Sequence, residues 1–394
     1  MPTAVRTQRL ARVGWVRLQG TQELAAVRGE SFFEPLSLPS LEAAKGRSSS
    51  PRPSGQLRES GRDDPRQRPL PAWKDKSGGG WLRPEGRAVL QGFKETAMPK
   101  WKYLLGPMRV PFLIVTLACV LLGVAAAVWT SGRVSPVYIA LALVGAVASH
   151  ISVNALNEYF DFQSGLDSRT TRTPFSGGSG TLPESPGHAH YALVTGSTAF
   201  AVTALIGIYF LSVRGLALLP LGLLGLLVIL AYTPWLTRNP VFCLVAPGLG
   251  FGPLMVMGTS FVLAGAYSWT AFFASLVPFF MVSDLLLLNQ FPDVQADKGV
   301  GRRHLPIVFG RRTSSFVYSA FLALAYLAVI VGVGLGYLPL PSLIGLGSVL
   351  LAVPASLGAL RHGEDIPRLI PYMGMNVLIS IATPALVAIG LFLG

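Results

Sequence analysis

The sequence predicts an all-α membrane protein with nine transmembrane helices and its N-terminus on the inner side. Hydrophobic residues make up 51% of the 394 residues and charged residues only 13%, about half of the charged share in soluble domains. From residue 98 onward, uncharged apolar runs are long enough to cross a bilayer core of about 30 Å. The basic residues between these runs lie almost entirely on one side, which indicates the orientation.

Nine apolar runs account for the chain after residue 98. Several contain Gly or Pro, as in Ala246-Pro247-Gly248 and Gly250-Phe251-Gly252-Pro253. Membrane helices tolerate these residues where neighbouring helices pack closely. The predicted spans are 110–130, 135–156, 190–213, 215–236, 241–265, 269–290, 314–337, 340–360 and 369–393.

The first 97 residues have a different composition. Segment 51–71, PRPSGQLRESGRDDPRQRPLP, has almost no apolar side chains to bury, and Gly78-Gly79-Gly80 is a flexible joint. We therefore expect a disordered extension over 1–97 and a membrane domain over 98–394. Two further interpretations of the extension stay open. The Arg-rich, acid-free residues 1–22 are typical of an organelle-targeting segment, and Met98 is a natural functional start.

The net charge of +13 lies mostly outside the predicted membrane domain. Residues 1–109 hold 20 of the 32 Lys and Arg residues. They contain no RNA-binding motif and no basic stripe interleaved with aromatic residues, which argues against a nucleic-acid partner. The lipid bilayer is the partner that the composition predicts.

The charged residues of the membrane domain gather on one side. The loops that we place inside carry ten basic residues, and the opposite loops carry only Arg133 and Arg214. All nine acidic residues of the domain lie in inside loops or on helix segments leading to them. Ionisable groups within membrane spans usually mark function. We therefore predict a multi-pass protein of the cell membrane with its site on the cytoplasmic side.

The first candidate motif ends the second predicted span. Asn157 and Asp161 are four residues apart and share a helix face, and Asn154 falls on the same stripe. Gly165 can break the helix and let Asp167 turn back toward that face.

The second candidate motif ends the sixth predicted span. Asn289, Asp293 and Asp297 repeat at intervals of four residues, again on one helix face. Both motifs contain Asn-x-x-x-Asp at the inner end of an even-numbered span. Equivalent sites four spans apart predict two related four-helix halves that face each other, followed by a ninth helix.

Two facing carboxylate clusters suit a magnesium-diphosphate site. Mg²⁺ prefers oxygen ligands and is usually held by one or two carboxylates together with substrate phosphates. Nearby cations can bind further phosphate oxygens, and the loop Thr173–Thr181, rich in Ser and Gly, can present backbone N–H groups to an anion. The candidate cations are Arg169, Arg172, Lys298, Arg302 and Arg303.

Simpler interpretations compete with each of these features. A single loop carboxylate is most often solvated, and a Ser/Gly loop is most often a linker. The position of His150 inside the second span favours a hydrogen-bonded packing role over catalysis. The role of Asp284 stays open. An ion-coupled transporter would also use intramembrane carboxylates, but it would place them near the midplane of the bilayer rather than at one face.

The motifs resemble those of the UbiA superfamily of intramembrane prenyltransferases. The segment Asn157-Glu-Tyr-Phe-Asp161-Phe-Gln-Ser-Gly-Leu-Asp167 is similar to the NDYFDxxxGxD form of 1,4-dihydroxy-2-naphthoate polyprenyltransferases, with Glu158 in place of the usual Asp. Asp293-Val-Gln-Ala-Asp297 matches the second DxxxD motif of the family, and Tyr232-Thr-Pro resembles its Tyr-containing loop after the fourth helix. The resemblance covers residues 98–394.

The resemblance implies Mg²⁺-dependent transfer of a polyprenyl group from polyprenyl diphosphate to an aromatic small-molecule acceptor. The implied acceptor is 1,4-dihydroxy-2-naphthoate, in menaquinone biosynthesis. Another quinone precursor, a glycerol-phosphate lipid and a tetrapyrrole are the alternatives. The implied metal ligands are Asp161, Asp167, Asp293 and Asp297, and the implied diphosphate ligands are Asn157, Asn289, Arg172, Lys298 and Arg302. Tyr159, Phe160 and Tyr232 would shield the allylic cation with their ring faces, so Asp161, Asp293, Tyr159 and Tyr232 are the implied catalytic residues.

Overall fold

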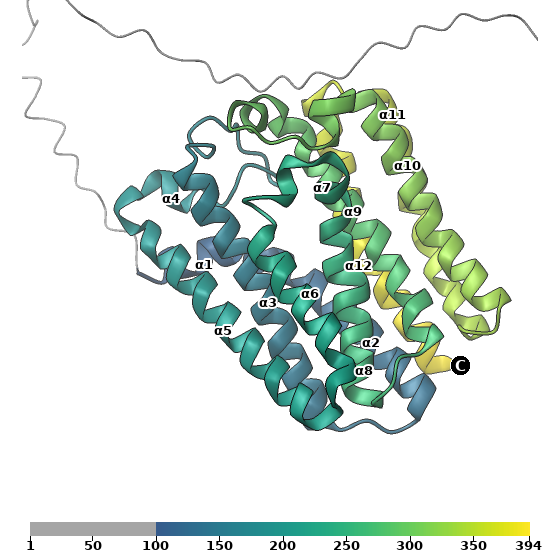
Figure 1. The fold of residues 1–394 in the computed structure, drawn as a ribbon. Coiled ribbons are helices and arrows are strands. Elements are labelled where there is room, and N and C mark those ends of the chain that lie inside the picture. Colours follow the sequence, from purple (N-terminus) through teal and green to yellow (C-terminus); the bar gives the residue numbers. More distant parts are fainter. Residues whose placement is uncertain (1–99) are drawn as a thin grey trace, which may run out of the picture. The chain divides into compact units, whose positions relative to one another are not determined.

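The computed structural model describes residues 100–394, which form helices joined by loops and contain no strand (Figure 1). The predicted extension over 1–97 lies outside the described residues. The helices are α1 (Lys100–Met108), η3 (Val110–Phe112), α2 (Leu113–Ser131), α3 (Pro136–Gln163), α4 (Thr181–Glu184), η4 (Pro186–His188), α5 (Ala189–Arg214), η5 (Leu216–Leu218), α6 (Leu219–Ala231), η6 (Leu236–Arg238), α7 (Pro240–Leu249), η7 (Gly250–Met257), α8 (Gly258–Ala264), α9 (Trp269–Gly299), α10 (Leu305–Gly334), η8 (Leu340–Ser348), α11 (Val349–His362) and α12 (Ile366–Leu393).

Eight helices of the described chain are long and apolar enough to cross a membrane. A shorter apolar helix, Leu216–Ala231, lies where we predict the fourth span. The all-α membrane fold is therefore confirmed, and the protein is a multi-pass integral membrane protein. The count of nine and the inner N-terminus stay predictions. The eight long helices are Val110–Ser131, Pro136–Gln163, Pro186–Arg214, Pro240–Ala264, Trp269–Gly299, Leu305–Gly334, Leu340–His362 and Ile366–Leu393.

The two helices that carry the motifs extend beyond the predicted spans. Helix α3 continues to Gln163 and α9 to Gly299, because the motif residues are themselves helical. Helix α3 ends just before Gly165, whose φ of 72° lies in the left-handed region that Gly adopts without strain. The predicted helix break at Gly165 is thus present. It lets the chain turn back over the end of α3.

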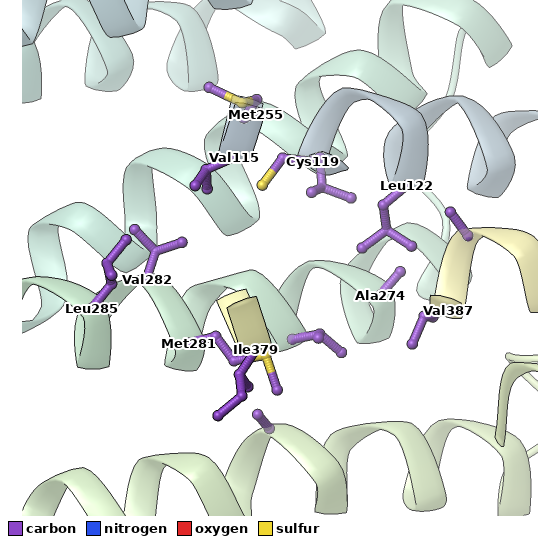
Figure 2. Close-up of a cluster of buried hydrophobic side chains, with 14 of the residues drawn as sticks. Val115, Cys119, Leu122, Met255, Ala274, Met281, Val282, Leu285, Ile379 and Val387 are labelled. Atoms are coloured by element: carbon purple, nitrogen blue, oxygen red, sulfur yellow. The ribbon is translucent and has the colours of Figure 1, made fainter. Parts of the chain in front are cut away.

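Helices α2, α9 and α12 form the centre of the bundle. Figure 2 shows Leu122 of α2, Met281 of α9 and Ile379 of α12 among the side chains of one buried cluster. Cys119 of α2 belongs to the same cluster and is fully buried, so it is a packing residue. This rigid centre positions α3 and α9, because α2 packs against α3 and α12 packs against α9.

Two glycines, Gly248 of α7 and Gly252 of η7, allow these helices to approach α9 closely. A Cβ at Gly248 would lie 2.0 Å from the Phe279 carbonyl oxygen, and a Cβ at Gly252 would lie 2.4 Å from the Ser275 carbonyl oxygen. Spacing of small residues by four is typical of membrane helices in backbone contact. The π-helical turn η7, Gly250–Met257, begins between these two glycines.

We expect Gly248→Ala and Gly252→Ala each to destabilise the protein by about 1–3 kcal/mol, the usual cost of overpacking a tight contact. Thermal unfolding in detergent measures this. Gly250→Ala is the matched control, since a Cβ at Gly250, in the same span, meets no atom within 4 Å. Equal losses in all three variants would show that the close contact with α9 does not determine the effect, because Ala favours a helix more than Gly does and a loss at Gly250 would need another cause.

Candidate active site

The two motifs meet at one end of the bundle, the end near α4 and α7 in the upper half of Figure 1. The C-terminal ends of α3 and α9 face each other there, and the loops after them close over a small polar pocket of about 100 Å³. The four predicted metal ligands, Asp161, Asp167, Asp293 and Asp297, all line this pocket. Residues that are more than 100 positions apart in the sequence therefore form one acidic site.

Arg302 joins the two motifs. Its guanidinium forms an ion pair with Asp161 of α3 through Nη2 and another with Asp297 of α9 through Nη1, the latter at 2.9 Å. Burial alone would lower the pKa of Arg302, but the carboxylates of Asp161 and Asp297 outweigh this effect and raise it. Arg302 therefore keeps its charge and holds the two helix ends together.

Asp297 is the most fully satisfied of the four carboxylates. It is 2% exposed. One oxygen accepts from Arg302, and the other lies 2.8 Å from Nε2 of His304. His304 is itself buried at the start of α10. These two contacts fix the orientation of the Asp297 carboxylate.

Other oxygens in the pocket are left without a partner. Oδ2 of Asp167, Oδ1 of Asp293 and Oδ1 of Asn289 are buried and accept no hydrogen bond from any residue of the 100–394 region. Buried polar atoms are normally satisfied. Three unpaired hard oxygens, from two motifs and around one pocket, are the donor set that Mg²⁺ prefers when substrate oxygens complete its shell.

Asp167 lies in the loop after α3, outside the membrane-spanning segment. Burial, followed by the like charges of Glu158 and Asp161, raises its pKa to about 7. Protons therefore compete with any cation for Asp167 near neutral pH, because a metal binds the deprotonated carboxylate.

Glu158 holds the Ser/Gly loop against α3. Both of its oxygens accept from the backbone N–H of Ser179, at 3.0 and 3.1 Å, and one also accepts from the Ser179 hydroxyl. Arg109 forms an ion pair with it at 3.2 Å. Gly177, Gly178 and Gly180 all have positive φ, and this lets the loop turn its N–H groups inward. The predicted anion-binding loop thus binds an anion, and this anion is the carboxylate of Glu158.

Asn157 ties the first motif to the loop after α6. Its amide nitrogen donates to the Thr233 hydroxyl at 3.1 Å, next to Tyr232. Asn157, Tyr232 and Asn289 each line the polar pocket and also a second, larger cavity. They therefore stand at the junction of the two spaces.

The second cavity is large and apolar. It has a volume of about 400 Å³ and runs among α3, α5, α6, η7 and α9. Ile208 of α5 and Leu223 of α6 line it and are also 63% and 58% exposed on the outer surface. The cavity therefore opens sideways at α5 and α6, on the apolar flank of the bundle.

A family model described as the UbiA prenyltransferase family matches residues 116–378, more than half of the chain. The chain belongs to the UbiA prenyltransferase family. This confirms the predicted superfamily and, at the level of the family, the prediction that the protein is a prenyltransferase.

Two curated relatives of this family member show modest identity. A 1,4-dihydroxy-2-naphthoate octaprenyltransferase of Bacillus subtilis is 26% identical over 186 residues, 46% of this chain and 57% of the relative. A 2-carboxy-1,4-naphthoquinone phytyltransferase of Synechocystis is 23% identical over 274 residues, 68% of this chain and 84% of the relative. The first match thus spans little more than half of that relative's length.

The solved structures support the same fold. The apo structure of a UbiA homolog from Aeropyrum pernix K1 superposes with a TM-score of 0.56 and 15% identity, covering 71% of this chain and 97% of that one. The α-helical UbiA architecture is therefore shared, although few residues are identical.

Six candidate site residues of this UbiA family member do not line the polar pocket: Tyr159, Phe160, Arg169, Arg172, Lys298 and Arg303. Tyr159 packs with Phe162 against the cluster that contains Leu182 on α4. Arg172 pairs with Glu184 at 3.0 Å on the surface, and the Lys298 side chain is exposed. Their assigned roles stay predictions, as do those of the residues that line the pocket.

Two residues of the site were not among the predicted ones. Arg109, at the break between α1 and η3, has a left-handed backbone with φ of 51° and lines both cavities. A basic residue just before Pro111 and the first apolar run is the signal that marks it. His304 follows Arg302 and Arg303 in the sequence. Apart from this position, nothing in the sequence predicts its contact with Asp297.

Proposed function

We propose that this protein transfers a polyprenyl group from polyprenyl diphosphate to an aromatic acceptor, 1,4-dihydroxy-2-naphthoate, at the cytoplasmic face of the cell membrane. One observation carries the proposal. An acidic pocket of about 100 Å³ adjoins an apolar cavity of about 400 Å³, and the two share Asn157, Tyr232 and Asn289. An amphiphile with a polar head and an apolar tail fits this pair of spaces.

The acidic pocket fits Mg²⁺ as the cofactor. Its unpaired oxygens belong to Asp167, Asp293 and Asn289, and Asp161 lies beside them in the same pocket. A bound Mg²⁺ would offset the negative charge that grows on the diphosphate as the allylic C–O bond breaks. In the part of the chain that the structure describes, no three His, Cys, Asp or Glu side chains enclose a metal by themselves. Substrate oxygens would therefore complete the coordination.

The protein side chains would position the reaction. In the proposed transfer, the C–O bond breaks and the diphosphate leaves with the electron pair. A ring carbon of the acceptor then supplies the electrons of the new C–C bond, and its ring proton is released. Tyr232 lines both the pocket and the cavity, where its ring would stabilise the cationic carbon. The apolar walls of the cavity exclude the water that would otherwise capture this carbon.

The acceptor class is supported by the names of two relatives, one a naphthoate prenyltransferase and the other a naphthoquinone phytyltransferase. An assay of membranes holding the protein, with labelled polyprenyl diphosphate and a panel of acceptors, tests the proposal. Transfer to 1,4-dihydroxy-2-naphthoate is expected. Transfer only to a glycerol phosphate or a tetrapyrrole would refute the acceptor, and no transfer at all would refute the reaction.

Removal of divalent cations is expected to abolish turnover, and Mg²⁺ is expected to restore it, because the unpaired side-chain atoms of the two motifs are the oxygens of Asp167, Asp293 and Asn289. The Mg²⁺ concentration that gives half-maximal rate should rise as the pH falls below about 7, since the raised pKa of Asp167 leaves that carboxyl protonated there. Titration of Mg²⁺ between pH 6 and 8 (roughly the range around that pKa) measures both effects. Full turnover in excess EDTA would contradict the metal assignment.

A further inference from the structure

His150 places a polar group in the wall of the apolar cavity. It lies on α3, is 7% exposed and lines the cavity. Its Nδ1 lies 2.7 Å from the hydroxyl of Thr116 on α2. Its ring meets the ring of Phe251 edge to face, with centroids 4.8 Å apart. Two neighbours thus fix the imidazole in one orientation.

The second ring nitrogen of His150 has no partner. Nδ1 is engaged by Thr116, so the ring geometry directs Nε2 away from that hydroxyl, and none of the residues from 100 to 394 forms a hydrogen bond with it. Nε2 is not among the fully buried side-chain atoms that lack a partner, so it is accessible from the cavity that His150 lines. A purely packing role, which the sequence favoured, would leave neither nitrogen open to the cavity.

The position of His150 relates it to the diphosphate pocket. It precedes Asn157 by seven residues, so the two side chains lie on the same face of α3, about 10 Å apart along the helix axis. Asn157 lines the polar pocket and the cavity, whereas His150 lines only the cavity. The length of α3 between them is enough for an aromatic bicycle with its oxygen substituents.

We propose that His150 recognises the acceptor, with Nε2 forming a hydrogen bond to an oxygen substituent of its aromatic ring. This inference rests on the proposed function and names the group that selects its acceptor. The neutral imidazole donates from one nitrogen and accepts at the other. Nε2 therefore binds a carbonyl or phenolate oxygen in one tautomer and a hydroxyl proton in the other. A prenyl chain offers neither and would leave Nε2 unpaired.

The test compares Michaelis constants for the two substrates in His150→Leu. The acceptor KM is expected to rise about tenfold or more, the factor that corresponds to about 1.4 kcal/mol, while the KM for prenyl diphosphate stays within about twofold. The difference from wild type should disappear with an acceptor analogue that lacks the ring oxygen. Thr116→Val, which frees the imidazole, should raise the acceptor KM by less.

Ser152→Ala is the matched control. Ser152 is also buried on α3, but it lines neither cavity and its hydroxyl donates to the Gly196 carbonyl at 2.9 Å, so both KM values should stay unchanged. If His150→Leu does not insert, His150→Gln serves for the same comparison, because it keeps a polar group but moves its hydrogen-bonding atoms.

Four results would overturn the inference. They are an unchanged acceptor KM, equal increases in both KM values, an altered preference for prenyl chain length alone, and no transfer by the wild type to any aromatic acceptor. The last result would also remove the proposed function. The first three, with an active wild type, would remove only the role of His150.

Discussion

Asp161→Ala and Asp293→Ala are each expected to lower turnover by at least ~10²–10³-fold while the protein stays folded in the membrane. The two carboxylates lie on different helices, α3 and α9, and line the same pocket. Each variant would remove one ligand for the cation that stabilises the leaving diphosphate. Turnover with labelled polyprenyl diphosphate measures the loss, and size-exclusion chromatography in detergent reports the fold.

The two variants differ in what else they change. Asp161 forms an ion pair with Arg302, so Asp161→Ala also removes one of the links between the motifs, although Asp297 still holds Arg302. Oδ1 of Asp293 accepts no hydrogen bond within the described region, so Asp293→Ala relieves an unsatisfied buried atom. We expect Asp293→Ala to be at least as stable as wild type and still inactive. This combination separates chemistry from folding.

Glu364→Ala is the control for these two variants. Glu364 is acidic and lies in the loop between α11 and α12, with its side chain 70% exposed and paired with Arg311 at 3.2 Å. An exposed ion pair contributes little, so turnover and stability should stay close to wild type. Near-normal turnover of Asp161→Ala and Asp293→Ala, or an equally large loss in Glu364→Ala, would argue against the two-motif site and for the transporter.

The sequence predicted the fold class and the two motifs because both depend on local periodicity. Apolar length defines a membrane span, and spacing by four places Asn157 and Asp161 on one face of α3. The fourth span is the exception. Its helix, Leu216–Ala231, is shorter than the predicted run 215–236, because the chain leaves the helix at Tyr232 to form the loop that binds Asn157.

Ion pairs between side chains from different segments of the bundle could not be predicted from residue spacing in the sequence. Several cations near the motifs were equal candidates for binding phosphate, yet Arg302 pairs with two carboxylates and Arg172 pairs with Glu184. Which cation turns inward depends on the path of loops after α3 and α9, and sequence periodicity does not specify a loop path. The inward turn of the Ser/Gly loop likewise depends on the carboxylate of Glu158.

That carboxylate is the basis of the largest expected effect on stability. Glu158→Ala should destabilise the protein by about 3–5 kcal/mol, the usual cost of removing one partner of a buried ion pair. The Glu158 side chain is 0% exposed, and its loss would leave Arg109 without its ion-pair partner and the Ser179 N–H without its acceptor. Thermal or denaturant unfolding of the purified protein in detergent measures the change.

Turnover should fall with stability in Glu158→Ala, because the loop that Glu158 holds also closes the polar pocket. Ser176, Gly177 and Gly178 line that pocket beside Asp167. Glu158→Asp keeps the charge but shortens the side chain by one methylene, so it should lose less stability than Glu158→Ala. Glu158→Gln keeps the length of the side chain but not its charge, so its stability should lie between those of Glu158→Asp and Glu158→Ala.

Glu184→Ala provides a matched comparison. Glu184 is also a glutamate paired with an arginine, Arg172, at 3.0 Å, but its side chain is 57% exposed. Solvent screens that pair, so its removal should change stability by no more than about 0.5 kcal/mol. If Glu158→Ala were as stable as Glu184→Ala, the Ser/Gly loop would be held by its own backbone turns rather than by Glu158.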